Sequence, residues 1–307
     1  MTAAIDDQGL LLNGLDGSNP LGFLAAVGTL RTVACIDPVT DWRMKWAIHN
    51  GIWAPALSSN GSVSEEHLIE LLVSALRRES TPEFDFDKNL NVTPKVFRKV
   101  AREAQCRASH LDRRYADFVA SFGCELILTS DRKSIQDTAL RTMSGAGHQH
   151  FLGTMKQLVH ETEAEHVRRS LFETWDYSDD KLGLRWDPGE DRRYALRWDD
   201  PSDNVTKTMH GANRLAVEAL PLFPVAPGGR QLDTTGFSSQ HGAAVFTWPI
   251  WEGALNVDVV RSLLAVPEIQ KAEPDRANLR ALGVVEVYKS QRITVGKYRN
   301  FTRAQPA

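Results

Sequence analysis

The chain has 307 residues and a formal net charge of −3, and 42% of its residues are hydrophobic. This length suits one large domain or two ordinary ones, with the composition of a soluble globular protein. No run approaches eighteen apolar residues, and no basic segment followed by an apolar one opens the sequence. We therefore expect no membrane span, no signal peptide, no membrane partner and a cytoplasmic location. Three dispersed cysteines favour reduced thiols over a disulfide framework or a zinc module.

The first predicted helix begins at Pro20, after a short apolar strand and a polar loop. Ser18 and Asn19 can each cap it, and proline suits the first helical position. Between residues 21 and 33 only Arg31 is charged, so we expect a helix that is buried on most of its circumference. Its small residues would let another backbone approach closely; they are Gly22, Ala25, Ala26 and Gly28.

Residues 41–53 predict a β-hairpin that turns at His49–Gly51. Trp42, Met44 and Trp46 alternate with charged residues, as expected of a strand with one buried face. The tryptophans are therefore predicted to lie in the core of a sheet and not to stack on a ligand.

A long helix is predicted from Pro94 to Phe122. Basic residues fall largely between its apolar positions; those assigned to nucleic-acid binding are Lys95, Arg98, Lys99 and Arg102. Such a face can follow a phosphate backbone. A solvated face is the alternative, and on this segment alone it is the commoner explanation.

The most enzyme-like feature is a Gly-rich turn with two histidines, His148 and His150. A histidine can act as a general base, and the N–H groups of the turn could stabilise an oxyanion or bind a phosphate. A Gly-rich turn with polar caps is the alternative. The acids and histidines that follow lack the spacing of a zinc site, so no metal and no cofactor are expected.

The acidic section contains a repeat, because Leu184–Pro188 is echoed at residues 196–201. This spacing predicts a hairpin with the two tryptophans as cross-strand neighbours. A second hairpin is predicted at the C-terminus, with a strand at Val284–Tyr288, a turn at Lys289–Arg292 and a return strand at Ile293–Phe301. Its cations and aromatic residues alternate, which is plausible for a nucleic-acid surface. The cations assigned to binding are Arg292, Lys297 and Arg299.

The segment Leu12–Arg31, together with Trp42, Trp46 and Trp53, resembles the N-termini of CRISPR-associated proteins from type I systems of the G (formerly U) branch. The relevant families are the helicase-nuclease extension proteins and the large-subunit-like proteins of the guide-RNA complex. The resemblance implies a component of an RNA-guided DNA surveillance complex, with guide RNA or target DNA and other CRISPR-associated subunits as partners. The chain has no Gly-Lys-Ser/Thr loop, no metal-binding His-Asp pair and no Asp-Glu helicase box. A binding or scaffolding subunit is therefore favoured over an enzyme.

We expect an α+β fold in which antiparallel hairpins pack against several helices and the N-terminal helix is buried. Residues 1–172 would form a region with the basic helix, and residues 173–307 a region with the two later hairpins; the two regions are either separate domains or one domain. Three functions remain open. They are a non-catalytic nucleic-acid-binding subunit of a defence complex, an enzyme that uses His148 or His150, and a protein-docking adaptor without nucleic-acid contact.

Overall fold

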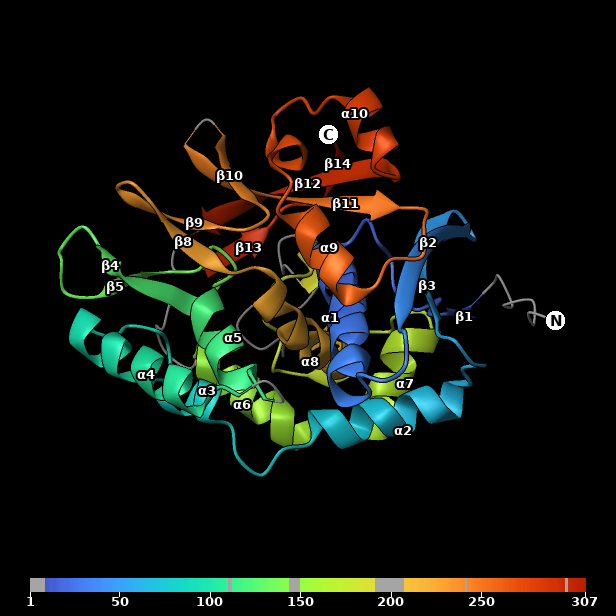
Figure 1. Cartoon of the computed structure of the whole chain (residues 1–307), viewed down its shortest axis with the longest axis horizontal. Helices are drawn as coiled ribbons and strands as arrows, with labels where there is room; N and C mark the ends of the chain where they lie inside the picture. Colours follow the sequence, from blue (N-terminus) through green and yellow to red (C-terminus); the bar gives the residue numbers. More distant parts are fainter. Residues whose placement is uncertain (1–8, 110–111, 144–149, 191–206, 241, 296–297) are drawn as a thin grey trace, which may run out of the picture.

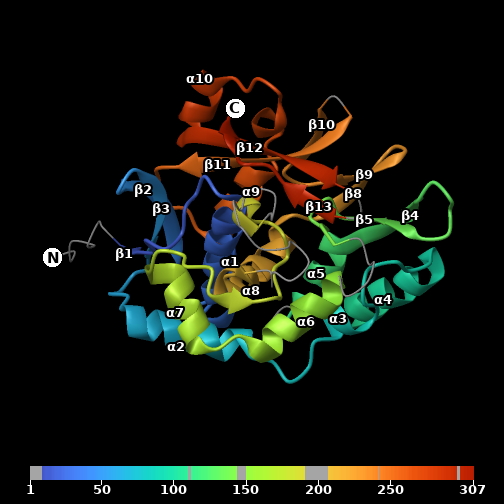
Figure 2. The ribbon, with the colours of Figure 1, turned by 180° about the vertical axis from the view of Figure 1, so that it is seen from behind.

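A computed structural model of the chain describes residues 9–109, 112–143, 150–190, 207–240, 242–295 and 298–307. Its helices are α1 (Pro20–Ile36), α2 (Glu65–Leu76), α3 (Pro82–Asp85), α4 (Pro94–Arg107), α5 (Arg114–Phe122), α6 (Phe151–Glu161), α7 (Ala164–Phe172), α8 (His210–Ala219), α9 (Val257–Leu264) and α10 (Arg276–Ala281). Helices α1 and α8 lie at the centre, with α2, α3, α4 and α6 along one side (Figure 1). From behind, α6 and α7 lie over α8 (Figure 2).

All the strand pairs of the described chain are antiparallel. The largest sheet has the order β10 (Phe237–Gln240), β11 (Ala243–Trp251), β12 (Val284–Val295) and β13 (Tyr298–Phe301), with β14 (Gln305–Pro306) also on β12. A second sheet has the order β1 (Leu10–Leu11), β3 (Ile52–Ser58) and β2 (Arg43–His49). Shorter hairpins pair β4 (Gly123–Leu128) with β5 (Ile135–Asp137), β6 (Asp179–Asp180) with β7 (Lys207–Thr208), and β8 (Val225–Gly228) with β9 (Gln231–Thr234). The expected α+β fold with antiparallel hairpins is confirmed.

Helix α1 begins and packs as its sequence predicts. The Asn19 side chain accepts hydrogen bonds from the N–H groups of Leu21 and Gly22, and the helix is buried throughout residues 20–33. A Cβ atom on Gly28 would lie 1.9 Å from the carbonyl oxygen of Leu215, so α1 and α8 touch backbone to backbone at this point. The expected close approach of another backbone is therefore confirmed, and the other backbone is α8.

The predicted Trp hairpin is also confirmed, as strands β2 and β3. Trp46 is buried and stacks on Phe23 of α1, with ring centroids 5.8 Å apart. Trp248 and Trp251 of β11 close the same aromatic cluster around Phe23. The two larger sheets therefore share one core with α1, and residues from both halves of the sequence form it.

A buried ion network holds the helices together around Glu218 of α8. Its Oε1 accepts hydrogen bonds from Arg214 (2.7 Å) and Arg114 (2.8 Å). Its Oε2 accepts from Arg31 (3.2 Å) and again from Arg114 (2.5 Å). Arg114 also donates to Glu83 of α3 at 2.7 Å. Burial opposes ionisation of Glu218, but the surrounding guanidinium groups outweigh it and hold the pKa of Glu218 well below its usual value.

The prediction of a single helix over residues 94–122 is wrong, because the segment forms two helices. Helix α4 ends at Arg107 and α5 begins at Arg114. Between them the Ser109 hydroxyl accepts a hydrogen bond from the Asp112 N–H at 3.0 Å, and the Ser109 N–H donates to the Asp112 carbonyl at 2.9 Å. These local bonds replace the helical ones, which is how serine and aspartate commonly interrupt a helix. The break lets α5 pack beside α4.

The turn expected at Lys289–Arg292 is wrong as well, because β12 runs through it without interruption. Its neighbour β11 pairs with it without interruption from Ala244, opposite Arg292, to Ile250, opposite Glu286. Within this stretch Ser290 is buried and donates its hydroxyl to the Thr302 carbonyl, whereas Gln291 is exposed. The C-terminal hairpin itself exists, but it is formed by β12 and β13.

The first segment of the acidic repeat, Leu184–Pro188, does not form the strand that the sequence predicts for it. Leu184–Asp187 is irregular, and Leu182 and Arg185 have positive φ angles that a strand cannot accommodate. Trp186 is fully buried and donates its indole N–H to the Leu140 carbonyl at 2.9 Å. The second copy, residues 196–201, lies outside the described residues.

Candidate nucleic-acid interface

Helix α4 positions most of the cations that the sequence assigns to binding. The Thr93 side chain caps it by accepting a hydrogen bond from the Val96 N–H. Phe97, Val100 and Ala104 are buried, and they follow the helical period. The opposite side of the helix therefore faces away from the core.

This outer side holds Lys95, Lys99 and Arg102, which are all exposed. They are separated by four and three residues and so lie along one helix face. None of them forms an ion pair with any residue in the described part of the chain. We call these three residues the α4 stripe.

The cations on either side of the α4 stripe are neutralised. Arg98 pairs with Glu125 of β4 at 2.9 Å, and Arg107 pairs with Glu103 one turn earlier at 2.6 Å. Arg98 was predicted to bind nucleic acid with its neighbours, but the structure gives it a carboxylate partner of its own. Unpaired positive charge is thus confined to the α4 stripe on this helix.

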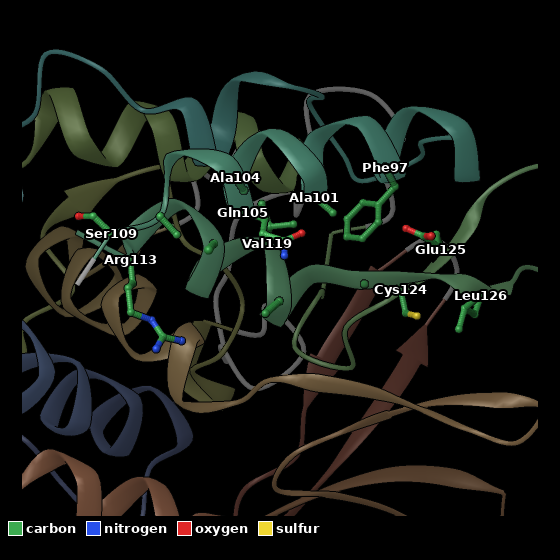
Figure 3. A pocket seen from close by; sticks show the side chains of 14 residues that line it. Phe97, Ala101, Ala104, Gln105, Ser109, Arg113, Val119, Cys124, Glu125 and Leu126 are labelled. Carbon is green, nitrogen blue, oxygen red and sulfur yellow. The ribbon is translucent and has the colours of Figure 1, made fainter. Parts of the chain in front are cut away.

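An apolar groove of about 690 Å³ lies beside α4, between this helix, α5 and β4 (Figure 3). Small and apolar side chains form its walls, among them Ala101, Ala104 and Val119. Arg113 at its end pairs with Asp117 at 3.4 Å. The groove can accept an apolar group, but it adds no unpaired charge to the α4 stripe.

The C-terminal hairpin brings two further predicted cations together. In the β12–β13 register Arg292 is opposite Phe301 and Thr294 is opposite Arg299. Residues two apart on a strand share a face, so Arg292 and Arg299 are diagonal neighbours on one side of the hairpin. Lys297 lies outside the described residues.

Both arginines contact the loop that follows β5. Arg292 Nη1 donates to the carbonyls of Ala139 (2.8 Å) and Arg141 (3.4 Å), and Arg299 Nη1 lies 3.5 Å from the same Arg141 carbonyl. The Arg141 side chain donates to the Met143 carbonyl at 2.9 Å and forms an ion pair with Asp137. We call Arg141, Arg292 and Arg299 the arginine cluster.

The electrostatics of the arginine cluster are unusual. Burial, together with the positive charges of Arg299 and Arg141, lowers the pKa of Arg292 to about 10, against a partial opposing effect of Asp137. Arg292 still carries its proton at pH 7, so three positive charges converge where the described residues supply one carboxylate. Buried or half-buried cations that outnumber their carboxylate partners repel one another, so the binding of an anion is favoured beside them.

The arginine cluster adjoins the start of α4. Arg141 Nη1 donates to the Asn91 side chain at 3.0 Å, and Asn91 lies two residues before the capping Thr93. The Ile135 N–H of β5 donates to the Val92 carbonyl in the same loop. The loop before α4 therefore links the arginine cluster to the helix that carries the α4 stripe.

His150 contacts Asn89, in the loop that precedes α4. The Asn89 amide oxygen accepts from the Phe151 N–H at 3.1 Å, so its NH₂ group faces His150 Nδ1, also at 3.1 Å. Nδ1 is therefore an acceptor, and the ring proton is on Nε2. Among the described residues the ring contacts Asn89 and no carboxylate or nucleophile, and Asn89 joins His150 to the start of α6. His148 lies outside those residues.

A group of His166, Asp179 and His210 is the one place among the described residues where ligand atoms of three metal-binding side chains come within 4.8 Å of one another. His166 Nδ1 accepts a hydrogen bond from the Glu163 N–H, which leaves the proton on Nε2 and no lone pair there for a metal. Asp179 pairs with Arg169. The donor set therefore fits a metal poorly.

Two buried carboxyl groups that the sequence did not single out lie near the starts of α1 and α8. Asp187 accepts hydrogen bonds from the Asn19 amide (3.0 Å) and the Tyr177 hydroxyl (2.8 Å). Glu190 accepts from Thr208, and burial followed by the nearby Asp187 charge raises the pKa of Glu190 to about 7. Both carboxyl groups are fully engaged with the chain itself, so they hold the segment of residues 177–190 in place.

Arg141 is the site residue that sequence reasoning missed. Nothing in its local sequence distinguishes it, because its neighbours in the arginine cluster come from a hairpin about 150 residues later in the chain.

Among the described residues, no helix combines the length and the hydrophobicity needed to cross a membrane. No known family model matches the chain, and no curated protein matches it either.

Proposed function

We propose that this protein is a cytoplasmic, non-catalytic nucleic-acid-binding subunit that holds a phosphate backbone along the α4 stripe and the C-terminal hairpin. The observation that supports this most strongly is the pattern of ion pairing on α4. Arg98 and Arg107 have carboxylate partners, whereas Lys95, Lys99 and Arg102 have none in the described chain. The positive charge of these three side chains is therefore available to a phosphate backbone, whereas that of Arg98 and Arg107 is balanced within the chain.

The length of the α4 stripe suits a nucleic-acid strand. The seven residue steps from Lys95 to Arg102 rise about 10 Å along the helix. One strand places a phosphate roughly every 3.4 Å along its axis, so about three phosphates lie opposite three cations. Phosphate contacts of this kind fix position without reading sequence.

The setting that we propose is an RNA-guided defence complex. It rests on the resemblance of Leu12–Arg31 and the following tryptophans to type I CRISPR-associated proteins of the G branch. The partners would be guide RNA or target DNA and other CRISPR-associated subunits. In such a complex base pairing reads sequence, and protein subunits hold the backbones.

The proposal is tested by comparing two triple variants that remove the same charge. The first, K95A/K99A/R102A, removes the α4 stripe; the second, R98A/R107A/R113A, removes three neighbouring cations that are each ion-paired. Affinity for a labelled oligonucleotide is measured across a salt series. Loss of three phosphate contacts should reduce the slope of log affinity against log salt by about 2 units for a single strand.

The second variant should change that slope much less, since its cations are already neutralised. Equal effects of the two variants would mean that only net charge matters, and the α4 stripe would not be the site. No binding by the wild type would favour the adaptor alternative instead. The apolar groove beside α4, with Leu126 69% exposed at its edge, would then be the surface to examine for a protein partner.

A further inference from the structure

The arginine cluster differs from the α4 stripe in shape and in burial. The α4 stripe is extended and exposed, whereas Arg292 and Arg299 converge on one carbonyl oxygen, that of Arg141. The Arg141 guanidinium is close enough for its charge to act on Arg292, so the three cations form a compact group and not an extended row.

The contacts within the cluster leave hydrogen-bond donors available. A guanidinium has five N–H donors, and in Arg292 and Arg299 the described residues accept bonds from Nη1 alone. These acceptors are backbone carbonyls, which position the side chains without neutralising them. Guanidinium groups held in this way are prepared for a planar or tetrahedral oxyanion.

The charge of the cluster indicates which oxyanion. Arg141 is the one member with an acidic partner among the described residues, Asp137, so the three arginines and that acid leave a net charge of +2. A phosphodiester has a single negative charge, whereas a phosphomonoester or free phosphate has about −1.5 to −2 at neutral pH. The dianion is therefore the better match. A carboxylate ligand would leave half of the charge uncompensated.

We propose that Arg141, Arg292 and Arg299 form a binding site for a phosphate dianion, either free phosphate or the phosphomonoester at the end of a nucleic-acid strand. Arg185 lies at the edge of this site, because its Nη1 is 3.4 Å from the side chain of Asn300, the residue after Arg299. Binding of the phosphorylated end of a nucleic acid would extend the proposed function, and this alternative rests on that function. The free-phosphate form does not.

The experiment uses the full chain and four probes. Three are oligonucleotides of one sequence with a 5′-phosphate, a 3′-phosphate or hydroxyls at both ends, and the fourth is inorganic phosphate. The test variant is R299Q, because Arg299 is only half-buried and makes one long contact, so folding should survive the change. R292Q is a second variant, and R230Q, at an exposed turn, is the control of equal charge.

We expect one phosphorylated end to raise affinity about tenfold over the hydroxyl strand, the effect of one charge-assisted hydrogen bond or more. Inorganic phosphate should compete with that strand and raise the melting temperature. R299Q should abolish the preference and the thermal shift, while R230Q keeps both. A shift shared by all variants would reflect the general stabilising effect of phosphate salts and would contradict the proposal.

The possible failures can be told apart. If all strands bind equally and phosphate has no specific effect, the dianion site is overturned and the proposed function stands. If no strand binds but phosphate stabilises wild type and not R299Q, the site stands with free phosphate as its ligand and the proposed function fails. If nothing binds, both fail.

Discussion

Replacement of Glu218 by glutamine should destabilise the protein severely. Glu218 is 2% exposed and is the common acceptor for Arg31, Arg114 and Arg214. Glutamine keeps the size of the side chain but removes its charge and places an NH₂ group against guanidinium donors. The effect on Arg214 should be largest, because this side chain is fully buried and would lose its carboxylate partner, with the Leu76 carbonyl as its other acceptor.

The magnitude follows from the burial of these charges. The network has three arginines and two glutamates, Glu218 and Glu83, so its net charge is +1 and becomes +2 in E218Q. Breaking a buried pair by removing one partner costs about 3 to 5 kcal/mol. Total stabilities are about 5 to 15 kcal/mol, so the variant should approach the limit of folding.

Urea denaturation followed by tryptophan fluorescence measures this cost. The matched control is E103Q, which breaks the exposed pair with Arg107 one turn away and should cost less than about 0.5 kcal/mol. The pKa of Glu218 is lower in the folded than in the unfolded protein, so its contribution is present above the unfolded value near 4.5 and is lost as the pH falls. The difference between wild type and E218Q should therefore narrow in acid. A cost for E218Q no larger than that for E103Q, at neutral pH, would refute the reasoning.

Three further changes probe the fold around α1. Gly28→Ala should cost at least about 3 kcal/mol in urea denaturation or prevent folding, because the new methyl group would lie 1.9 Å from the Leu215 carbonyl; an effect below 1 kcal/mol would contradict the backbone contact. Glu190→Gln should remove a pH dependence of the free energy of unfolding. The pKa of Glu190 is raised to about 7 in the folded protein, so wild type should lose up to about 3 kcal/mol as the pH rises from about 4.5 to 7, and parallel wild-type and variant urea midpoints at pH 5 and 7.5 would contradict this. Asn19→Asp should keep the helix cap but place a second carboxylate against Asp187, so that it melts lower than Asn19→Ala above pH 5; the reverse order would contradict the contact.

The elements that the sequence predicts well are specified by local chemistry. The start of α1 depends on Asn19 and Pro20, which act within one turn. The hairpin of β2 and β3 depends on strict alternation and on Asn50 and Gly51, which adopt the positive φ angles of a tight turn. Each of these features is complete within a few residues, so the sequence pattern is sufficient.

The elements that the sequence mispredicts depend on distant partners. The polar stretch Lys289–Arg292 has the composition of a turn, but β11 supplies a continuous edge that keeps it extended. Trp186 repeats the pattern of a strand, but burial against the Leu140 carbonyl takes precedence. In both cases tertiary contacts override the local preference.

The candidate site divides in the same way. Helical spacing alone predicts that Lys95, Lys99 and Arg102 share a face, because the period of a helix is fixed. That Arg98 is neutralised cannot be predicted, since its partner Glu125 comes from the following strand. The arginine cluster is beyond prediction for the same reason, because Arg141 meets the C-terminal hairpin only in the folded chain.

The most direct test of the central claim is a binding titration of the purified wild-type chain with labelled single-stranded RNA, single-stranded DNA and duplex. Each titration is repeated at several salt concentrations between about 50 and 200 mM. We expect saturable binding to at least one of these, with a slope of log affinity against log salt of about −2 or steeper. Absence of saturable binding at the lowest salt, or binding that does not weaken as salt rises, would contradict it.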